Sequence, residues 1–299
     1  MPKNPLAEVF GYPVDNMSQD AINHRQGRLC PYHNSSGLNC TKNSATDPLG
    51  VCTIFEGDRL VVTCPIRLRQ DLKIVADAAS FFFPSMRYVA LTEARLKEKN
   101  GKSAGNIDMV IAALDDKDEI VDFGAVEVQA VYISGNVSKV FQEYMKNPAA
   151  NYAIDWPSKN YPNPDYLSSS RKRLAPQLIY KGGILHKWGK KMVVVVHQGF
   201  FDQLPRLKQV RESNAEIAWM IYDFQHDKAN NRYMLDRKDV KYTKFESALT
   251  TITTPTIGDM AEFLKYLRGR IKQGKVMGSP FPSEVPPEIE PLPDIFEEE

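Results

Sequence analysis

Two stretches in the middle of the chain combine the alternation of a β-strand with an acidic residue in apolar surroundings. Residues 107–114 and 121–131 are separated by the acidic segment 115–118, a pattern that predicts a β-hairpin. Successive side chains of a strand point to opposite faces, so Glu127 points away from the face of its two valine neighbours. Pairing of the two strands is expected to bring Asp108 and Glu127 together at one end of the hairpin.

Exposure to solvent is the simplest explanation of an acid in a strand, because antiparallel sheets commonly turn one face to water. Here both faces of the second strand are apolar, with Val126 and Val128 on one face and Phe123 and Ala125 on the other. A carboxylate in a strand that is covered on both sides is costly unless it is paired or bound to a metal. Two converging carboxylates form a site for a hard divalent cation with oxygen ligands.

The remaining periodicity predicts a sheet wrapped by helices, and therefore an α/β fold. Helices are predicted over 136–145, over 176–181, where Gly182-Gly183 would end the helix, and over 257–271, as an amphipathic closing helix. Buried strands are predicted over 192–196 and 217–224. No run of about eighteen apolar residues occurs, so no membrane-spanning segment is expected. His197, at the end of an apolar run, is interpreted as a core hydrogen-bonding residue.

The charge of the chain is unevenly distributed. The net charge of the 299 residues is +1, but the segment from Glu284 onwards carries seven acids and no base, which leaves +8 on residues 1–283. A moderately basic body suits a nucleic-acid partner. The acidic, proline-rich tail, 279–299, is expected to be extended, either as a solvated appendage or as an arm on a dimer partner.

One long stretch without periodicity, 147–170, runs into a cluster of basic residues. Long irregular loops in compact enzymes are usually functional or disordered, and this one is expected to lie against DNA. Arginine pairs with the N7 and O6 atoms of guanine, and amides and carboxylates can accept from the cytosine amino group. The candidate DNA-contacting residues in and after this loop are Asn151, Arg171, Arg173 and Gln177.

All four cysteines of the chain, Cys30, Cys40, Cys52 and Cys64, lie within a short N-terminal segment. No apolar export signal precedes them, so a cytoplasmic, reducing compartment of a bacterial type is expected and a metal site is favoured over disulfides. The segment between the last two cysteines carries a Glu-Gly-Asp turn that predicts a hairpin and brings both thiolates together. A tetrahedron of four thiolates suits structural zinc or iron, with free buried thiols as the alternative.

Together these motifs resemble the NotI-type restriction endonucleases. The similarity lies in Ala-Glu-Val-Phe-Gly-Tyr-Pro-Val, in the four cysteine motifs that follow and in Gly-Ala-Val-Glu-Val-Gln, which occur in the family order over about residues 7–140. The resemblance implies a PD-(D/E)XK restriction-endonuclease-like core, in which helices flank a mixed central sheet, and an N-terminal four-cysteine metal-binding subdomain. The expected division is 1–75 for the metal-binding region, 76–278 for the nuclease domain and 279–299 for the tail.

The resemblance also assigns residues to the active site. Asp108, Glu127 and Gln129 take the catalytic positions, with Gln129 where the usual lysine would stand. Asp108, Glu127 and the carbonyl of Val128 are expected to hold Mg²⁺. The family uses a further upstream glutamate, for which Glu93 is the best match and Glu98 the competitor.

The implied function is that of a homodimeric type II restriction endonuclease. It is expected to hydrolyse duplex DNA at a palindromic, GC-rich site with magnesium, to leave 5′ overhangs and to act beside a cognate DNA methyltransferase. The resemblance further implies iron at the four cysteines, where zinc remains possible by ligand chemistry. Two other functions stay open: a repair or mobile-element nuclease of the same fold, and a non-enzymatic DNA-binding protein with a four-cysteine metal site.

Overall fold

The computed structural model describes residues 4–33, 38–44, 46–157 and 159–275. The chain divides into two compact units, Met1–Thr254 and Pro255–Glu299, and the cysteine-containing region belongs to the first. The acidic tail predicted at 279–299 lies outside the described residues. The domain boundaries expected at residues 75 and 278 stay predictions.

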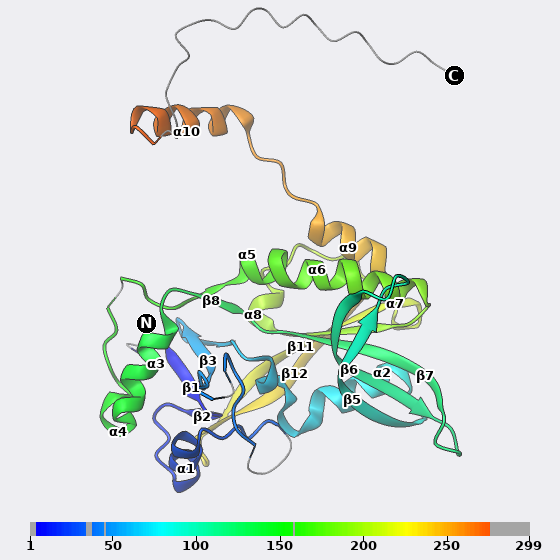
Figure 1. The fold of residues 1–299 in the computed structure, drawn as a ribbon, viewed down its shortest axis with the longest axis horizontal. Coiled ribbons are helices and arrows are strands. Elements are labelled where there is room, and N and C mark those ends of the chain that lie inside the picture. Colours follow the sequence, from blue (N-terminus) through cyan, green and yellow to red (C-terminus); the bar gives the residue numbers. More distant parts are fainter. Residues whose placement is uncertain (1–3, 34–37, 45, 158, 276–299) are drawn as a thin grey trace, which may run out of the picture. The chain divides into compact units, whose positions relative to one another are not determined.

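A six-stranded mixed sheet forms the centre of the first unit (Figure 1), in the order β12-β11-β10-β7-β6-β5. Its strands are β5 (Arg87–Lys97), β6 (Ser103–Leu114), β7 (Ile120–Gln129), β10 (Met192–His197), β11 (Ile217–Asp227) and β12 (Arg232–Thr243). β10 runs parallel to β7 and to β11, and the other neighbours are antiparallel. The mixed central sheet and the predicted strands are therefore confirmed.

Apolar residues cover both faces of the central strands, as the sequence of β7 indicated. All six residues of β10 are buried. Val194 and Val196 belong to one apolar cluster, and Val193 and Val195 belong to the other. This alternation places one hydrophobic core on each side of the sheet.

Helices flank the sheet on both sides. Those described in the first unit are α1 (Gln19–Gly27), α2 (Lys73–Phe82), α3 (Val137–Lys146), α4 (Pro148–Asn151), α5 (Tyr166–Ser169), α6 (Ala175–Gln177), α7 (Gly183–Lys187), α8 (Gln198–Phe201) and α9 (Phe245–Thr253). α2 contributes to the core on the Val193 side, whereas α3, α7 and α9 contribute to the core on the Val194 side. The predicted helix over 136–145 corresponds to α3, which Asn136 caps by accepting from Lys139 N.

The segment from α5 to α7 is one continuous helical run and corrects two expectations. Two π-helical segments, η2 (Ser170–Leu174) and η3 (Leu178–Gly182), join α5, α6 and α7, so Gly182-Gly183 does not end the helix. A Cβ on Gly182 would lie 2.7 Å from the Phe245 ring, so this glycine allows α9 to pack closely. The loop expected over 147–170 is also interrupted by α4, by β9 (Asn163–Asp165) and by α5.

A second sheet, in the order β2-β1-β3-β4, carries the cysteine region. Its strands are β1 (Leu6–Val9), β2 (Tyr12–Pro13), β3 (Val51–Glu56) and β4 (Arg59–Val62). β3 and β4 pair antiparallel, which confirms the hairpin expected between Cys52 and Cys64. A short pair, β8 (Tyr132–Ser134) with β9, follows the central strand β7.

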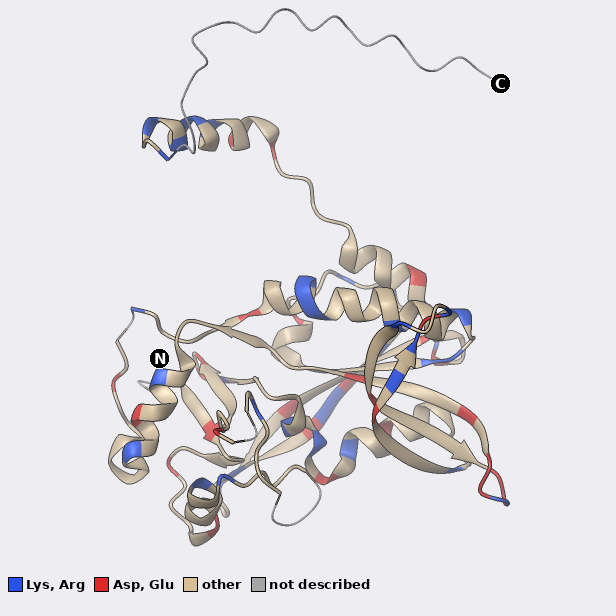
Figure 2. Cartoon of the chain, in the orientation of Figure 1, with Lys and Arg blue, Asp and Glu red and all other residues tan. Residues whose placement is uncertain are grey.

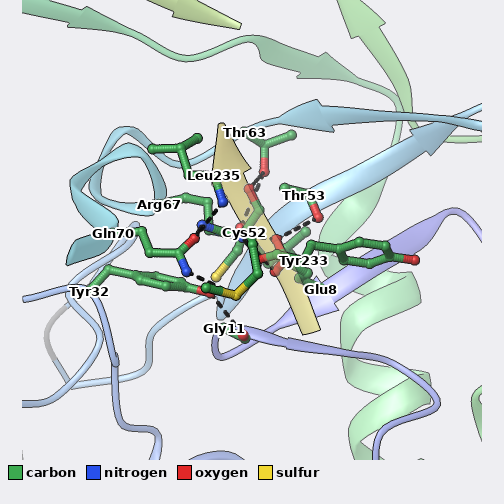
Figure 3. A network of polar contacts seen from close by, with 12 residues as sticks. Glu8, Gly11, Tyr32, Cys52, Thr53, Thr63, Arg67, Gln70, Tyr233 and Leu235 are labelled. Carbon is green, nitrogen blue, oxygen red and sulfur yellow. Dashed lines mark hydrogen bonds and ion pairs between the residues drawn. The ribbon is translucent and has the colours of Figure 1, made fainter. Parts of the chain in front are cut away.

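A buried ion pair joins this second sheet to the central one (Figure 3). The Arg67 guanidinium, on the 3-10 helix η1 (Pro65–Leu72), donates to both carboxylate oxygens of Glu8 at 2.8 and 3.0 Å, and neither side chain is exposed. It also donates to the backbone oxygen of Tyr233 on β12 at 2.6 Å. The rings of Tyr32 and Phe224 each lie 4.4 Å from the guanidinium carbon. Arg67 therefore contacts both sheets at once.

The second unit contains α10 (Met260–Lys272), which corresponds to the helix predicted over 257–271. Its apolar side chains are exposed, Met260 by 75% and Phe263 by 58%. The amphipathic helix is confirmed, and its role as a closing helix stays a prediction. None of the described helices has the length and apolar character needed to cross a membrane.

Candidate active site

The β6–β7 hairpin brings the two predicted acids together. Met109 pairs with Val126, so the neighbouring positions Asp108 and Glu127 lie directly opposite each other. One carboxylate oxygen of Asp108 accepts a 2.8 Å hydrogen bond from the backbone N–H of Val128. This bond fixes the Asp108 carboxylate at the end of the hairpin. The convergence expected from the strand alternation is confirmed.

Glu127 is a buried carboxylate with one unsatisfied oxygen. It is 1% exposed, and its burial together with the neighbouring Asp108 carboxylate raises its pKa to about 8. Its Oε2 forms an ion pair with Lys181, whereas its Oε1 has no hydrogen-bond donor among the described residues. A buried oxygen without a donor beside a second carboxylate fits a hard divalent cation, which would satisfy both groups.

Gln129 lies two residues beyond Glu127 on the same strand and is also buried. Its amide Nε2 donates to the backbone oxygen of Ala130 at 2.5 Å. This side chain can donate a hydrogen bond, but it brings no positive charge to the two carboxylates.

Glu93 lies on β5 across from Asp108. The neighbouring pairs Thr92–Met109 and Ala94–Ile107 set this register. Glu93 has a φ of 54°, a left-handed conformation that costs a residue other than glycine about 1–3 kcal/mol and that is found frequently at functional sites. Glu98 lies beyond the end of β5, where its carboxylate accepts from Asn100. The structure thus places Glu93, rather than Glu98, beside the acids.

A cavity of about 950 Å³ opens over this end of the hairpin. Asp108, Val128 and Gln129 line it together with residues of the cysteine region and of the α5–α7 helical run. The basic and amide side chains that line it are His33, Lys42, Asn43, Gln129, Asn136, Lys172, Arg173 and Gln177. One carboxylate and several cations in the lining of the same cavity are suited to a phosphate-containing substrate next to a metal ion.

The sequence of the chain is similar to that of a known enzyme family. Residues 8–235 match the family model of the restriction endonuclease NotI. The chain belongs to the NotI restriction endonuclease family. It is therefore a type II site-specific deoxyribonuclease, and the alternative of a non-enzymatic DNA-binding protein is excluded. No curated protein matched the sequence of this NotI-family enzyme.

Of the four residues predicted to contact DNA, two line the cavity of this NotI-family enzyme and two do not. Arg173 and Gln177 line the cavity, and Arg173 lies over the Tyr132 ring at 5.2 Å. Arg171 is exposed on η2 but is not among the residues that line the cavity. Figure 2 shows this basic turn between α5 and α6. Asn151 does not line the cavity, and its amide donates to Glu143 O of α3 at 2.7 Å, so its contact with DNA stays a prediction.

The four cysteines of this NotI-family enzyme are buried free thiols. Burial and the neighbouring Cys64 and Cys40 raise the pKa of Cys30 to about 12, so these thiols interact electrostatically. Within the described ranges, no group of three or more His, Cys, Asp or Glu side chains is arranged to hold a metal ion. A four-cysteine metal site therefore stays a prediction.

Sequence reasoning missed two lysines of the site. Lys42 lines the cavity, and Lys181 contacts Glu127. The helical spacing of Lys181 could have indicated its burial, because it follows Leu178 by three residues and precedes Leu185 by four, and both leucines are buried. A lysine at helical spacing among apolar residues needs a buried partner. The predicted core role of His197 is confirmed, since its Nε2 lies 3.1 Å from Asp223 and its Nδ1 accepts from Gly199 N.

Proposed function

We propose that this enzyme cuts both strands of duplex DNA at a palindromic, GC-rich site in a magnesium-dependent hydrolysis that leaves 5′ overhangs. The observation that carries the proposal is the opposition of Asp108 and Glu127, with Asp108 at the wall of a cavity that basic side chains also line. Metal-dependent cleavage of a phosphodiester needs carboxylate ligands beside a groove that accepts phosphates.

The donor set suits Mg²⁺. Asp108, Glu127 and the carbonyl of Val128 would hold the ion, and the unsatisfied Oε1 of Glu127 supports this set. When bound, Mg²⁺ polarises the scissile phosphate and lowers the pKa of a bound water. The remaining coordination positions are left to water and to phosphate oxygens, as magnesium prefers.

The chain's own residues orient the reacting groups. The Val128 N–H holds the Asp108 carboxylate in place, and the Gln129 amide can donate to the attacking water or to the phosphate. Lys172 and Arg173, at the cavity wall, bind the DNA backbone. A water oxygen attacks phosphorus in line, the bond to the 3′ oxygen breaks, and the 3′ oxygen takes up a proton. The products are a 5′-phosphate and a 3′-hydroxyl.

A plasmid assay tests the chemistry and the target together. Purified protein is expected to linearise or fragment plasmid DNA in MgCl₂ and to leave it intact in EDTA. The sequenced ends are expected to be palindromic, GC-rich and to carry 5′ overhangs, because a two-fold dimer reads the same sequence in each half-site. Blunt or non-palindromic ends would contradict the dimer, and an AT-only palindrome would contradict the expected base content alone.

A repair or mobile-element nuclease of the same fold is the alternative. It would not need a modification partner, whereas the proposed restriction enzyme requires a cognate DNA methyltransferase that protects the host site. Methylating the recognition sequence of the plasmid is expected to block cleavage; unimpaired cutting of every methylated form would favour the alternative.

We also propose that the four cysteines hold one structural iron or zinc ion. Lys42 supports this proposal. Its ammonium donates to Val51 O and, at 2.8 Å, to Thr63 Oγ1; burial lowers the pKa of Lys42, and the neighbouring Cys64, Cys52 and Cys40 oppose that shift. Metal-bound thiolates would provide the negative charge that a buried cation needs.

Freshly purified protein is expected to contain about one iron or zinc ion per chain by elemental analysis. Cys52→Ser is expected to remove the metal and to lower the midpoint of thermal unfolding, because closed metal sites contribute folding free energy. Thr53→Ser, which keeps a hydroxyl in the same strand, serves as the control. Metal-free wild-type protein that is fully folded would refute the site.

A further inference from the structure

Lys181 is a charged residue in a position that normally holds an apolar one. It lies on η3 within the α5–α7 helical run, is 6% exposed and shares its buried face with Leu178 and Leu185. Burying an ammonium group is costly unless a partner compensates its charge. The position of Lys181 therefore depends on the groups that its Nζ contacts.

Those groups belong to the two strands that carry the acids. The Lys181 ammonium forms an ion pair with Oε2 of Glu127 on β7, across 54 residues of sequence. It also donates at 2.9 Å to the backbone oxygen of Asn106 on β6, two residues before Asp108. Lys181 is the only cation paired with Glu127 in the described part of the chain.

Backbone features bring the side chain to this point. The π-helical turn η2 separates the buried residues Ser169 and Leu174 by five positions and sets the helix phase that carries Lys181 inward. A Cβ on Gly105, which has a φ of 108°, would lie 3.7 Å from Lys181 Cδ, so the lysine stem crosses β6 over this glycine.

Among the residues that the structure describes, no other cation is paired with the Asp108 or Glu127 carboxylate. Gln129 occupies the position from which a lysine would act, but its amide carries no charge and donates to Ala130 O. Negative charge develops on the phosphate during in-line attack, and a fixed cation in a water-poor site stabilises it.

We propose that Lys181 supplies from a helix the positive charge that Gln129 cannot supply from β7, and that it positions the Glu127 carboxylate for the reaction. This inference rests on the proposed metal-dependent cleavage. In this arrangement the helical run delivers the lysine, and the strand keeps only a hydrogen-bonding residue at position 129.

The test moves the charge from one element to the other. Three variants of the full-length protein are compared with wild type: Lys181→Met, the double variant Lys181→Met with Gln129→Lys, and Lys187→Met as the control. Lys187 is exposed on α7 of the same helical run. The single-turnover cleavage rate is measured in saturating MgCl₂, and DNA affinity and the thermal midpoint are measured in EDTA.

Lys181→Met is expected to lower the cleavage rate by about 10²- to 10³-fold, while DNA affinity in EDTA stays within about threefold of wild type. The double variant is expected to cleave DNA at least about tenfold faster than Lys181→Met, because a lysine at position 129 restores the positive charge from the strand. Lys187→Met is expected to cut like wild type. A purely structural ion pair would lower the thermal midpoint and would give no recovery.

Two results would overturn the proposal: a Lys181→Met rate within about threefold of wild type, or a folded double variant that cuts no faster than Lys181→Met. If Lys181→Met does not fold, Lys181→Gln replaces it in both variants, because its amide still donates to Glu127. A wild-type protein that leaves DNA intact in MgCl₂ would refute the proposed function itself, and the two failures are thereby distinguished.

Discussion

Replacing Asp108 with asparagine is expected to lower the rate of DNA cleavage by about 10³-fold or more. The substitution removes the charge of a proposed metal ligand, and metal-ion stabilisation of a phosphoryl transition state contributes several kcal/mol. An asparagine oxygen can still accept from Val128 N, so the hairpin is expected to keep its structure. Single-turnover cleavage in MgCl₂ measures the effect, and circular dichroism checks the fold.

Glu127→Gln is expected to cause a comparable loss of activity. Asp122→Asn is the matched control, because Asp122 lies on the same strand, 45% exposed, in an ion pair with Lys190. The control is expected to cut at the wild-type rate. Retained cleavage in either Asp108→Asn or Glu127→Gln would show that these carboxylates do not form the active site.

Arg67→Met is expected to lower the free energy of unfolding by about 3–5 kcal/mol. The substitution leaves the Glu8 carboxylate buried without its cation and removes the donor to Tyr233 O. Urea unfolding, followed by tryptophan fluorescence, measures the change. The loss is expected even in protein that still carries its proposed metal.

The control for this prediction is Arg59→Met. Arg59 lies 4.0 Å from Asp202 with its side chain 76% exposed, and exposed ion pairs contribute about 0–1 kcal/mol. Similar losses in Arg67→Met and Arg59→Met would show that the ion pair between the two sheets does not stabilise the fold.

The parts of the site that lie on one hairpin could be predicted from the sequence. Asp108 and Glu127 are separated by a single turn, and strand alternation fixes the faces on which they lie. The β3–β4 hairpin was predictable for the same reason. In both cases, local periodicity and turn residues determine the pairing.

The parts that depend on distant contacts could not be predicted in this way. Gly182-Gly183 is a typical end of a helix, yet the helix continues through both glycines, and the Phe245 ring, far along the chain, packs where a Cβ of Gly182 would stand. The ion pair of Lys181 with Glu127 likewise depends on how the helical run packs on the sheet. The strained backbone of Glu93 has no signal in the sequence.

The single helical run from α5 to α7 has a consequence for protein engineering. It carries Arg173 and Gln177, which line the cavity, and Lys181, which contacts Glu127, within nine residues of one helical rod. Substitutions that retarget the enzyme by shifting or tilting this rod would also displace the lysine from the carboxylate. Variants selected for a new target sequence are therefore expected to cleave DNA more slowly, unless their new contacts leave the axis of the rod unchanged.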